Sequence, residues 1–242
     1  MDVRSLERAE EAVALVGDAL RDAGAEGELS HGLLLRLVDE PDAWGDEVTI
    51  LVGVEDGRPA ALVTMTGSFP ALIVGFGDPG AVDVAAFVDA MQTAGRRPDA
   101  INGARRWSEP FAAAWEAAGA QAQVGRDMRA FELRRVVRPR PPGGRARPAS
   151  PADAAVLAGW VVAFGEDIGE TVTAEEAERM VARLLQLDDL LVWQDAGQPV
   201  SMAAIMRRTP LSSTVALVYT PPHLRGRGYA SAVVAQLSQR EL

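Results

Sequence analysis

The residues best suited to chemistry lie between Thr214 and Ser231, where the sequence reads TVALVYTPPHLRGRGYAS. An apolar, strand-forming run leads into two consecutive prolines, which stop strand pairing and leave backbone groups free at the strand end. Gly226 and Gly228 then let backbone amides crowd together at the start of a helix, where unsatisfied N–H groups and the helix dipole favour an anion. Arg225 and Arg227 add positive charge beside these amides. The segment predicts a phosphate site next to a strand edge.

Several other kinds of site are excluded by the composition. All 24 basic residues are Arg, and the absence of Lys removes a Walker A phosphate lysine, a pyridoxal Schiff base and a lysine general base. The absence of Cys removes thiol nucleophiles and thiolate metal sites, and two His cannot build a multi-histidine metal centre. A dinucleotide fingerprint also fails, because its third glycine position is occupied by Ser231.

The pattern that remains is R-x-x-G-x-A, which Arg225, Gly228 and Ala230 meet after a strand. It resembles the pyrophosphate-binding motif of the GNAT N-acetyltransferase superfamily, and the run TPPHLRGRGYAS resembles the actinobacterial type. The resemblance covers about residues 145 to 242. It implies that the loop amides hold the pyrophosphate of acetyl-CoA, and that the preceding strand splays from its neighbour and pairs with the pantetheine amides. The implied cofactor-binding residues are Val218, Tyr219, Thr220, Arg225, Gly226, Arg227, Gly228, Tyr229, Ala230 and Ser231.

Acetyl transfer also needs a base that deprotonates the amine and a donor that stabilises the oxyanion. The backbone N–H of Val218 or its neighbour is the expected oxyanion donor. An acidic cluster, Glu166, Asp167 and Glu170, is expected in the loop between the first two helices of the second half. In the family this loop covers the acceptor pocket, so these acids are the candidate general bases; the alternative is a solvated acidic loop.

Other residues near the motif have simpler interpretations. His223 precedes the Arg-Gly turn and is interpreted as an exposed loop residue, with a phosphate or ribose contact as the alternative. Trp160, Phe164 and Trp193 are expected to fill the core. In the family, the pyrophosphate helix is followed by further strands and by a helix that bears a Tyr often used as the general acid. The sequence ends at Leu242 inside that helix, so we expect the second half to lack those strands and that Tyr.

The elements that must position the motif repeat in order along the chain. In the first half, helices are expected over 5–23, 29–39, 79–95 and 108–118, and strands over 47–54, 59–66, 69–76, 99–103 and 121–137. In the second half, helices are expected over 151–164, 173–187 and from Gly228, and strands over 190–194, 200–207 and 213–219. The expected fold class is α/β (α+β), with mixed, largely antiparallel GNAT-type sheets flanked by helices in two similar halves.

A composition change separates the halves. The run RRVVRPRPPGGRARP holds six Arg, four Pro and two Gly with no acid, which is typical of a linker; a basic arm is the alternative. We expect a degenerate GNAT-like domain over 1–135, a linker over 136–148 and an acetyl-CoA-binding GNAT domain over 149–242. After its third strand the first half has Asp78 and no Arg, a combination that repels pyrophosphate. An unrelated α/β domain is the alternative for this half.

These observations predict an N-acetyltransferase that moves an acetyl group from acetyl-CoA to a primary amine by direct attack in a ternary complex. No metal is expected, and the acceptor is a small-molecule amine or a peptide N-terminus. The net charge of −10 argues against a nucleic-acid binder that uses the Arg-rich run. Without a signal peptide or a long apolar span, the expected location is cytoplasmic and no membrane partner is expected. A homodimer is possible through an open sheet edge. A non-catalytic acyl-CoA-binding or regulatory module is the second hypothesis.

Overall fold

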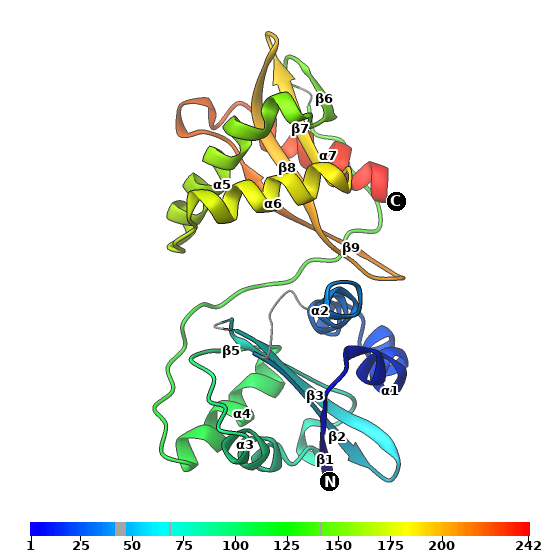
Figure 1. The fold of residues 1–242 in the computed structure, drawn as a ribbon. Helices are drawn as coiled ribbons and strands as arrows, with labels where there is room; N and C mark the ends of the chain where they lie inside the picture. The colour runs from blue at the N-terminus through cyan, green and yellow to red at the C-terminus, as the bar shows by residue number, and fades with distance from the viewer. Residues whose placement is uncertain (42–46, 68, 141) are drawn as a thin grey trace. The chain divides into compact units, whose positions relative to one another are not determined.

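The computed structural model describes residues 1–41, 47–67, 69–140 and 142–242. It divides into two compact units, Met1–Phe131 and Glu132–Leu242 (Figure 1). Each unit contains one β-sheet with helices packed on both faces, and each has its own buried apolar clusters.

The N-terminal unit is built on a five-stranded sheet in the order β1-β2-β3-β4-β5. The first four strands are antiparallel, and β5 runs parallel to β4. Helices α1 and α2 cover one face of the sheet, and α3 and α4 cover the other. The elements are β1 (Asp2–Leu6), α1 (Ala9–Asp22), α2 (Glu28–Asp39), β2 (Val48–Glu55), β3 (Arg58–Thr66), β4 (Ala71–Gly75), α3 (Val84–Thr93), β5 (Ile101–Asn102) and α4 (Arg105–Ala117).

The C-terminal unit is built on a four-stranded antiparallel sheet in the order β6-β7-β8-β9. Helices α5 and α6 pack on one face, against side chains such as Val192, Met202 and Leu217. Helix α7 packs on the other face, against Leu191 and Ile205. The elements are β6 (Arg145–Pro148), α5 (Ala154–Ile168), α6 (Ala174–Gln186), β7 (Leu190–Asp195), β8 (Gln198–Arg208), β9 (Ser213–Tyr219) and α7 (Tyr229–Glu241).

The two units share one order of elements: an edge strand, two helices, three antiparallel strands and a helix. Their first hairpins also share a turn in which two consecutive residues are left-handed. Asp56 and Gly57 have φ of 49° and 77°, and Ala196 and Gly197 have φ of 47° and 81°. Such a two-residue turn matches the twist of the flanking strands. The expected mixed α/β fold with two similar, helix-flanked halves is confirmed.

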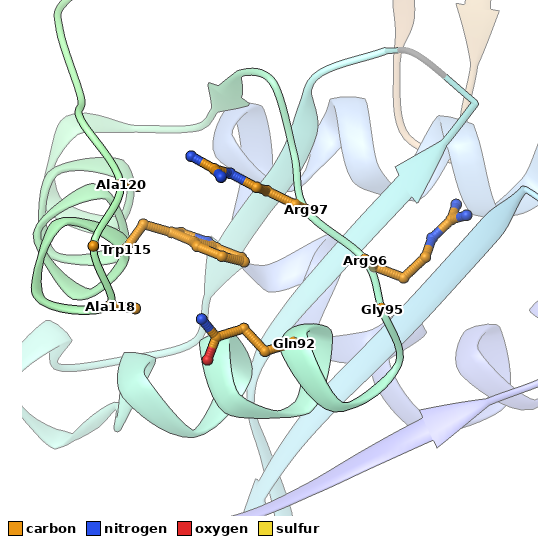
Figure 2. A pocket seen from close by; sticks show the side chains of 8 residues that line it. Gln92, Gly95, Arg96, Arg97, Trp115, Ala118 and Ala120 are labelled. Atoms are coloured by element: carbon orange, nitrogen blue, oxygen red, sulfur yellow. The ribbon is translucent and has the colours of Figure 1, made fainter.

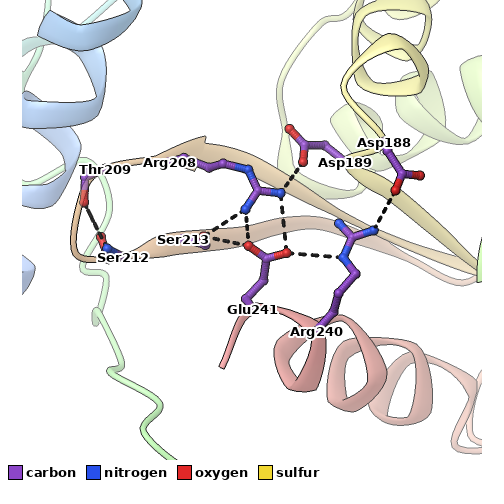
Figure 3. Close-up of polar contacts among 8 residues, drawn as sticks. All are labelled: Asp188, Asp189, Arg208, Thr209, Ser212, Ser213, Arg240 and Glu241. Atoms are coloured by element: carbon purple, nitrogen blue, oxygen red, sulfur yellow. Dashed lines mark hydrogen bonds and ion pairs between the residues drawn. The ribbon is translucent and has the colours of Figure 1, made fainter.

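The C-terminal end of α7 is tied to the sheet by an ionic network (Figure 3). Arg208, on β8, contacts both the buried carboxylate of Asp189 and the carboxylate of Glu241 at the end of α7. Ser213 also donates a hydrogen bond of 2.8 Å to Glu241. The network fixes α7 at its far end, so the start of the helix is held in a defined position above the sheet.

The sequence predicted neither of the edge strands β1 and β6. The helix expected from Ser5 begins only at Ala9, because Asp2–Leu6 pairs antiparallel with β2 as β1. The linker expected over 136–148 contains β6, because Arg145–Pro148 pairs antiparallel with β7. Both corrections have one physical cause, since pairing with a distant strand outweighs the local sequence preference.

Two further differences concern the first half. The strand expected over 121–137 does not form, and its residues up to 135 are exposed without a neighbouring strand among the described residues. The helix expected over 79–95 is divided into a 3₁₀ turn, Pro79–Ala81, and α3. The division arises because Asp83 caps α3 by accepting a 3.3 Å hydrogen bond from the Ala86 amide.

Candidate functional site

The strand that leads into the motif, β9, is interrupted by a β-bulge. Met202 pairs with Tyr219 and Ala204 pairs with Ala216, so Leu217 and Val218 together face the single residue Ala203. Leu217 adopts a left-handed backbone with φ of 52°, which a side chain with a Cβ rarely adopts. Bulges of this kind re-aim side chains and end strand pairing beside functional sites. Here the bulge changes the course of β9 immediately before the motif.

The end of β9 is fixed from the neighbouring strand. The Ser201 hydroxyl, fully buried on β8, donates a 3.0 Å hydrogen bond to the Tyr219 carbonyl. It also lies 2.8 Å from the hydroxyl of Thr220, which is 8% exposed. These buried bonds hold the backbone at the point where the chain leaves the sheet.

The loop that follows presents free amides at the start of α7. Gly226 and Gly228 have φ of 77° and 84°. Apart from the adjoining residues, a Cβ on either would meet no atom of the described residues within 4 Å, so backbone conformation and not crowding requires these glycines. Gly228 is the N-cap and supplies no side-chain hydrogen bond, and the first helical bond runs from the Ala232 amide to the Gly228 carbonyl at 3.0 Å. Within the described part of the chain, the amides of residues 229–231 have no acceptor. This helix start is open to an anion.

Arg225 connects this loop to α5. Its Nε donates a 2.8 Å hydrogen bond to the Thr220 carbonyl, and its Nη2 pairs with the carboxylate of Asp167 in the last turn of α5. The guanidinium also lies 5.5 Å from the centre of the Tyr219 ring, and the centre of that ring lies 6.1 Å from the centre of the Trp160 ring, with the two planes tilted by 45°. Arg225 therefore fixes the loop to the fold through three contacts.

The candidate cofactor residues divide into those that face outward and those that face the core. Arg225, Gly226, Arg227, Gly228 and Ser231 are exposed, whereas Tyr219 and Tyr229 are each 6% exposed. The Tyr229 hydroxyl donates a 2.5 Å hydrogen bond to Asp195, which raises the pKa of the phenol. Both tyrosine side chains belong to the core, so only their backbone is available to a ligand at this site. Arg227 donates to the His223 carbonyl at 3.3 Å, and His223 is exposed as expected.

The acidic cluster does not lie wholly in a loop, as the sequence suggested. Glu166 and Asp167 belong to the last turn of α5, and only Glu170 lies in the connection to α6. All three are exposed, and the structure joins Asp167 to the motif through Arg225. The helix extends further than expected because Gly169, with φ of 76°, supplies the left-handed C-cap that ends it.

The large aromatic side chains pack as expected. Trp193 is buried against α7, and Trp160 and Phe164 pack partly buried on the α5–α6 side of the sheet. The Trp193 indole nitrogen donates to the Gly143 carbonyl at 2.8 Å.

The corresponding position of the first half is already occupied by the chain's own carboxylates. After β4, the Asp78 side chain accepts a 2.9 Å hydrogen bond from the Gly80 amide, and Asp83 caps α3. Two negative groups therefore take the amides that a bound anion would need. This contrasts with α7, whose N-cap is a glycine without a side chain.

Sequence reasoning missed the groups that support the loop from behind. Leu217 gives no signal, because leucine has no preference for a left-handed backbone. Ser201 gives a weak one, as a polar residue inside the apolar strand run VSMAAIM. The contact between Asp167 and Arg225 joins residues 58 positions apart, so no local pattern could indicate it.

The described residues contain neither a metal-binding group nor a membrane-spanning helix. Across these residues, no group of His, Cys, Asp or Glu has the size and geometry to hold a metal ion. No helix in the same described ranges is long and apolar enough to cross a membrane.

Comparison with known proteins supports the fold. No family model matches the sequence, and no curated protein matches it. The chain is similar to a GNAT-family acetyltransferase from Colwellia psychrerythraea, with a TM-score of 0.50 at 9% identity over 99% of this chain and 85% of that one. It is also similar to a Drosophila protein, with a TM-score of 0.52 at 12% identity over 98% and 84% of the two chains.

A third similar structure covers a smaller part of the chain. It is a predicted acetyltransferase from Clostridium acetobutylicum, solved with acetyl-CoA, with a TM-score of 0.33 and 21% identity over 40% of this chain and 71% of that one. The first two likenesses, at low identity, establish the architecture alone: two helix-flanked mixed sheets in two similar halves, as in the GNAT-like fold.

Proposed function

We propose that this chain is an N-acetyltransferase of the GNAT superfamily, of the actinobacterial type and with two GNAT-like halves in tandem. The C-terminal half binds acetyl-CoA, and the N-terminal half is a degenerate copy with a structural or substrate-shaping role. The fold, the R-x-x-G-x-A motif and the different helix starts of the two halves support this assignment. The proposed location is the cytoplasm, and the proposed acceptor is a small amine or a peptide N-terminus.

The observation that carries the proposal is the uncapped start of α7. Three consecutive amides, at residues 229–231, have no acceptor among the described residues, and the glycine N-cap leaves the space in front of them open. A pyrophosphate supplies acceptor oxygens and negative charge, which the amides and the positive end of the helix both favour. In the first half, Asp78 and Asp83 fill that role internally.

The strand before the loop supports a second part of the ligand. β9 is the last strand in the sheet order, so its outer edge has no neighbouring strand among the described residues. The edge backbone near Val218 and Thr220 can pair with the amides of the pantetheine arm as an added strand would. Nearby backbone N–H groups can donate to the oxyanion of the tetrahedral intermediate, and Val218 is the proposed donor.

The proposed reaction is direct attack by a neutral primary amine on the thioester carbonyl. The new C–N bond forms, the tetrahedral intermediate collapses with loss of the thiolate, and the amine proton passes to a base. Glu166, Asp167 and Glu170 are the candidate bases. Asp167 is the least suited of them, because its carboxylate is already engaged in an ion pair with Arg225.

This ion pair also favours a second candidate function, a non-catalytic acyl-CoA-binding or regulatory module. If Asp167 serves only to hold the loop, the exposed Glu166 and Glu170 are the remaining candidate acids. The two functions differ in one measurement. Both predict binding of acetyl-CoA, but only the transferase releases free thiol when amines are supplied.

The test uses a charge placed at the helix start. Ser231→Glu puts a carboxylate beside the free amides of α7, where it stabilises the helix and repels pyrophosphate. We expect calorimetry to show a loss of acetyl-CoA affinity of at least tenfold, about 1.4 kcal/mol, with an unchanged or higher melting temperature. Gln236→Glu adds the same charge on an exposed position of the same helix and should bind as the wild type. Equal binding by both variants would rule out the site.

A further inference from the structure

A cavity of about 250 Å³ opens in the N-terminal unit between the C-terminal ends of α3 and α4 (Figure 2). None of its lining residues is acidic, although the chain as a whole carries a net charge of −10. The side chains that matter for binding are those of Gln92, Arg97, Trp115, Ala118 and Ala120.

The backbone around the cavity is fixed by two matching helix ends. Gly95 and Gly119, with φ of 66° and 92°, each end a helix in the left-handed conformation. The amides that follow bond back into the helices, from Arg96 to the Met91 carbonyl at 2.8 Å and from Ala120 to the Trp115 carbonyl at 2.9 Å. The cavity is therefore built on rigid elements and not on a free loop.

Trp115 brings an unused hydrogen-bond donor to this cavity. The residue is 5% exposed, and its indole nitrogen is buried without a hydrogen-bond partner among the residues that the structure describes. Buried tryptophans usually place this N–H against an acceptor, and an unsatisfied buried donor calls for an explanation. A ligand oxygen that accepts from Nε1 would supply the missing partner.

The charge at the cavity comes from Arg97. Its side chain is exposed and forms no ion pair or hydrogen bond with any residue that the structure describes. Arg96 differs, because it donates to the Thr49 hydroxyl at 3.0 Å and to the Glu47 carbonyl at 2.9 Å. Figure 2 shows the Trp115 indole between the side chains of Arg97 and Gln92. Among the described residues, the uncommitted guanidinium of Arg97 and the indole of Trp115, whose buried Nε1 is also uncommitted, thus line one cavity.

We propose that this cavity binds a small organic carboxylate. One carboxylate oxygen accepts from the Trp115 indole N–H, the guanidinium of Arg97 pairs with the carboxylate, and the apolar part of the ligand packs on the indole and on the Ala118 and Ala120 methyl groups. Nε1 is inaccessible to water, so a ligand reaches it only after the exposed side chains beside the indole, Arg97 and Gln92, have shifted. A monoanion is favoured over phosphate, since the negative ends of α3 and α4 both meet the cavity.

The test follows the indole signals in ¹H–¹⁵N spectra of the full chain, which contains five tryptophans. Trp115→Phe identifies the Trp115 signal by its disappearance. Acetate, butyrate and benzoate are then titrated at constant ionic strength, with inorganic phosphate as the comparison. We expect a saturable downfield shift of the Trp115 indole proton, with a dissociation constant on the order of 1 mM for benzoate, weaker binding of acetate and none of phosphate.

A matched pair of variants tests the role of the guanidinium. Arg97→Gln removes the charge from an exposed side chain, and we expect it to raise the benzoate dissociation constant about tenfold. Arg129→Gln removes the same charge from an exposed position of the same unit outside the cavity and should leave the constant unchanged. The proposal is overturned by a Trp115 signal that no carboxylate shifts, by phosphate binding as tightly as benzoate, or by wild-type affinity in Arg97→Gln.

Discussion

Arg225 meets three groups at once: the Asp167 carboxylate, the Thr220 carbonyl and the Tyr219 ring. The arginine of the motif therefore joins α5 to the loop, and the neighbouring amides remain open to a phosphate. The glycines of this loop were predictable from the sequence, because a left-handed backbone selects them. The ion pair between Arg225 and Asp167 was not predictable, because the two residues lie 58 positions apart and the acidic neighbours of Asp167 suggested a general base.

Replacing Asp167 by Asn separates these two roles. If the carboxylate holds Arg225, Asp167→Asn weakens acetyl-CoA binding by no more than about fivefold, because an ion pair exposed to this extent is worth at most about 1 kcal/mol. Steady-state kinetics should then show a higher KM for acetyl-CoA with kcat nearly unchanged. Glu175→Gln breaks an exposed pair with Arg179 on α6 and is the control. A fall in kcat of about 100-fold or more at constant KM would instead identify Asp167 as the base.

At the scale of elements, the sequence predicted those helix starts that nearby residues determine. Thr173 begins α6 through a capping box with Glu176, and this start was expected from the sequence. The edge strands β1 and β6 and the segment 121–137 were assigned wrongly, because whether a short polar run forms a strand depends on a partner strand far along the chain. The Arg-rich run looked like a linker for this reason.

The strand β6 has a specific anchor that makes its pairing testable. Arg147 donates two hydrogen bonds, of 2.7 and 2.8 Å, to the buried carboxylate of Asp153 before α5, and the Ser150 amide and hydroxyl donate to it as well. The guanidinium is the main reason that the pKa of Asp153 falls from 3.8 to about 2. A depressed carboxyl pKa stabilises the folded state above the unfolded-state pKa, and this stabilisation is lost as the pH falls through the folded-state value.

We therefore expect Asp153→Asn to destabilise the C-terminal unit by about 2 kcal/mol at pH 7. The difference from the wild type should shrink between about pH 4 and pH 2, because the wild-type carboxyl is then protonated as well. Urea unfolding, followed by hydrogen exchange in β6 and α5, measures both values. Glu178→Gln, at an exposed position of α6, should change stability little at either pH. A destabilisation that stays the same down to pH 2 would mean that charge is not its cause.

At the scale of the whole molecule, the two units repeat one order of elements but differ at the helix that follows the third strand. In the N-terminal unit, Asp78 and Asp83 occupy the amides before and at the start of α3. In the C-terminal unit, Gly228 leaves those of α7 open. One architecture thus yields one half that neutralises its own helix start and one that is able to bind an anion there. Each unit also has its own core on both faces of its sheet.

This division predicts where a bound coenzyme adds stability. A ligand that binds one unit protects that unit against opening by RT ln(1 + [L]/Kd), about 2.7 kcal/mol at 100 times Kd. Hydrogen exchange with acetyl-CoA should therefore slow in the core strands β7, β8 and β9 by about 100-fold, while β2 and β3 exchange as before. At the same acetyl-CoA concentration, Ser231→Glu should reduce the slowing to about tenfold or less, because its affinity is at least tenfold lower. Equal slowing in both sheets would show that the units open as one cooperative body, and slowing only in β2 and β3 would assign the coenzyme to the half whose helix start Asp83 already fills.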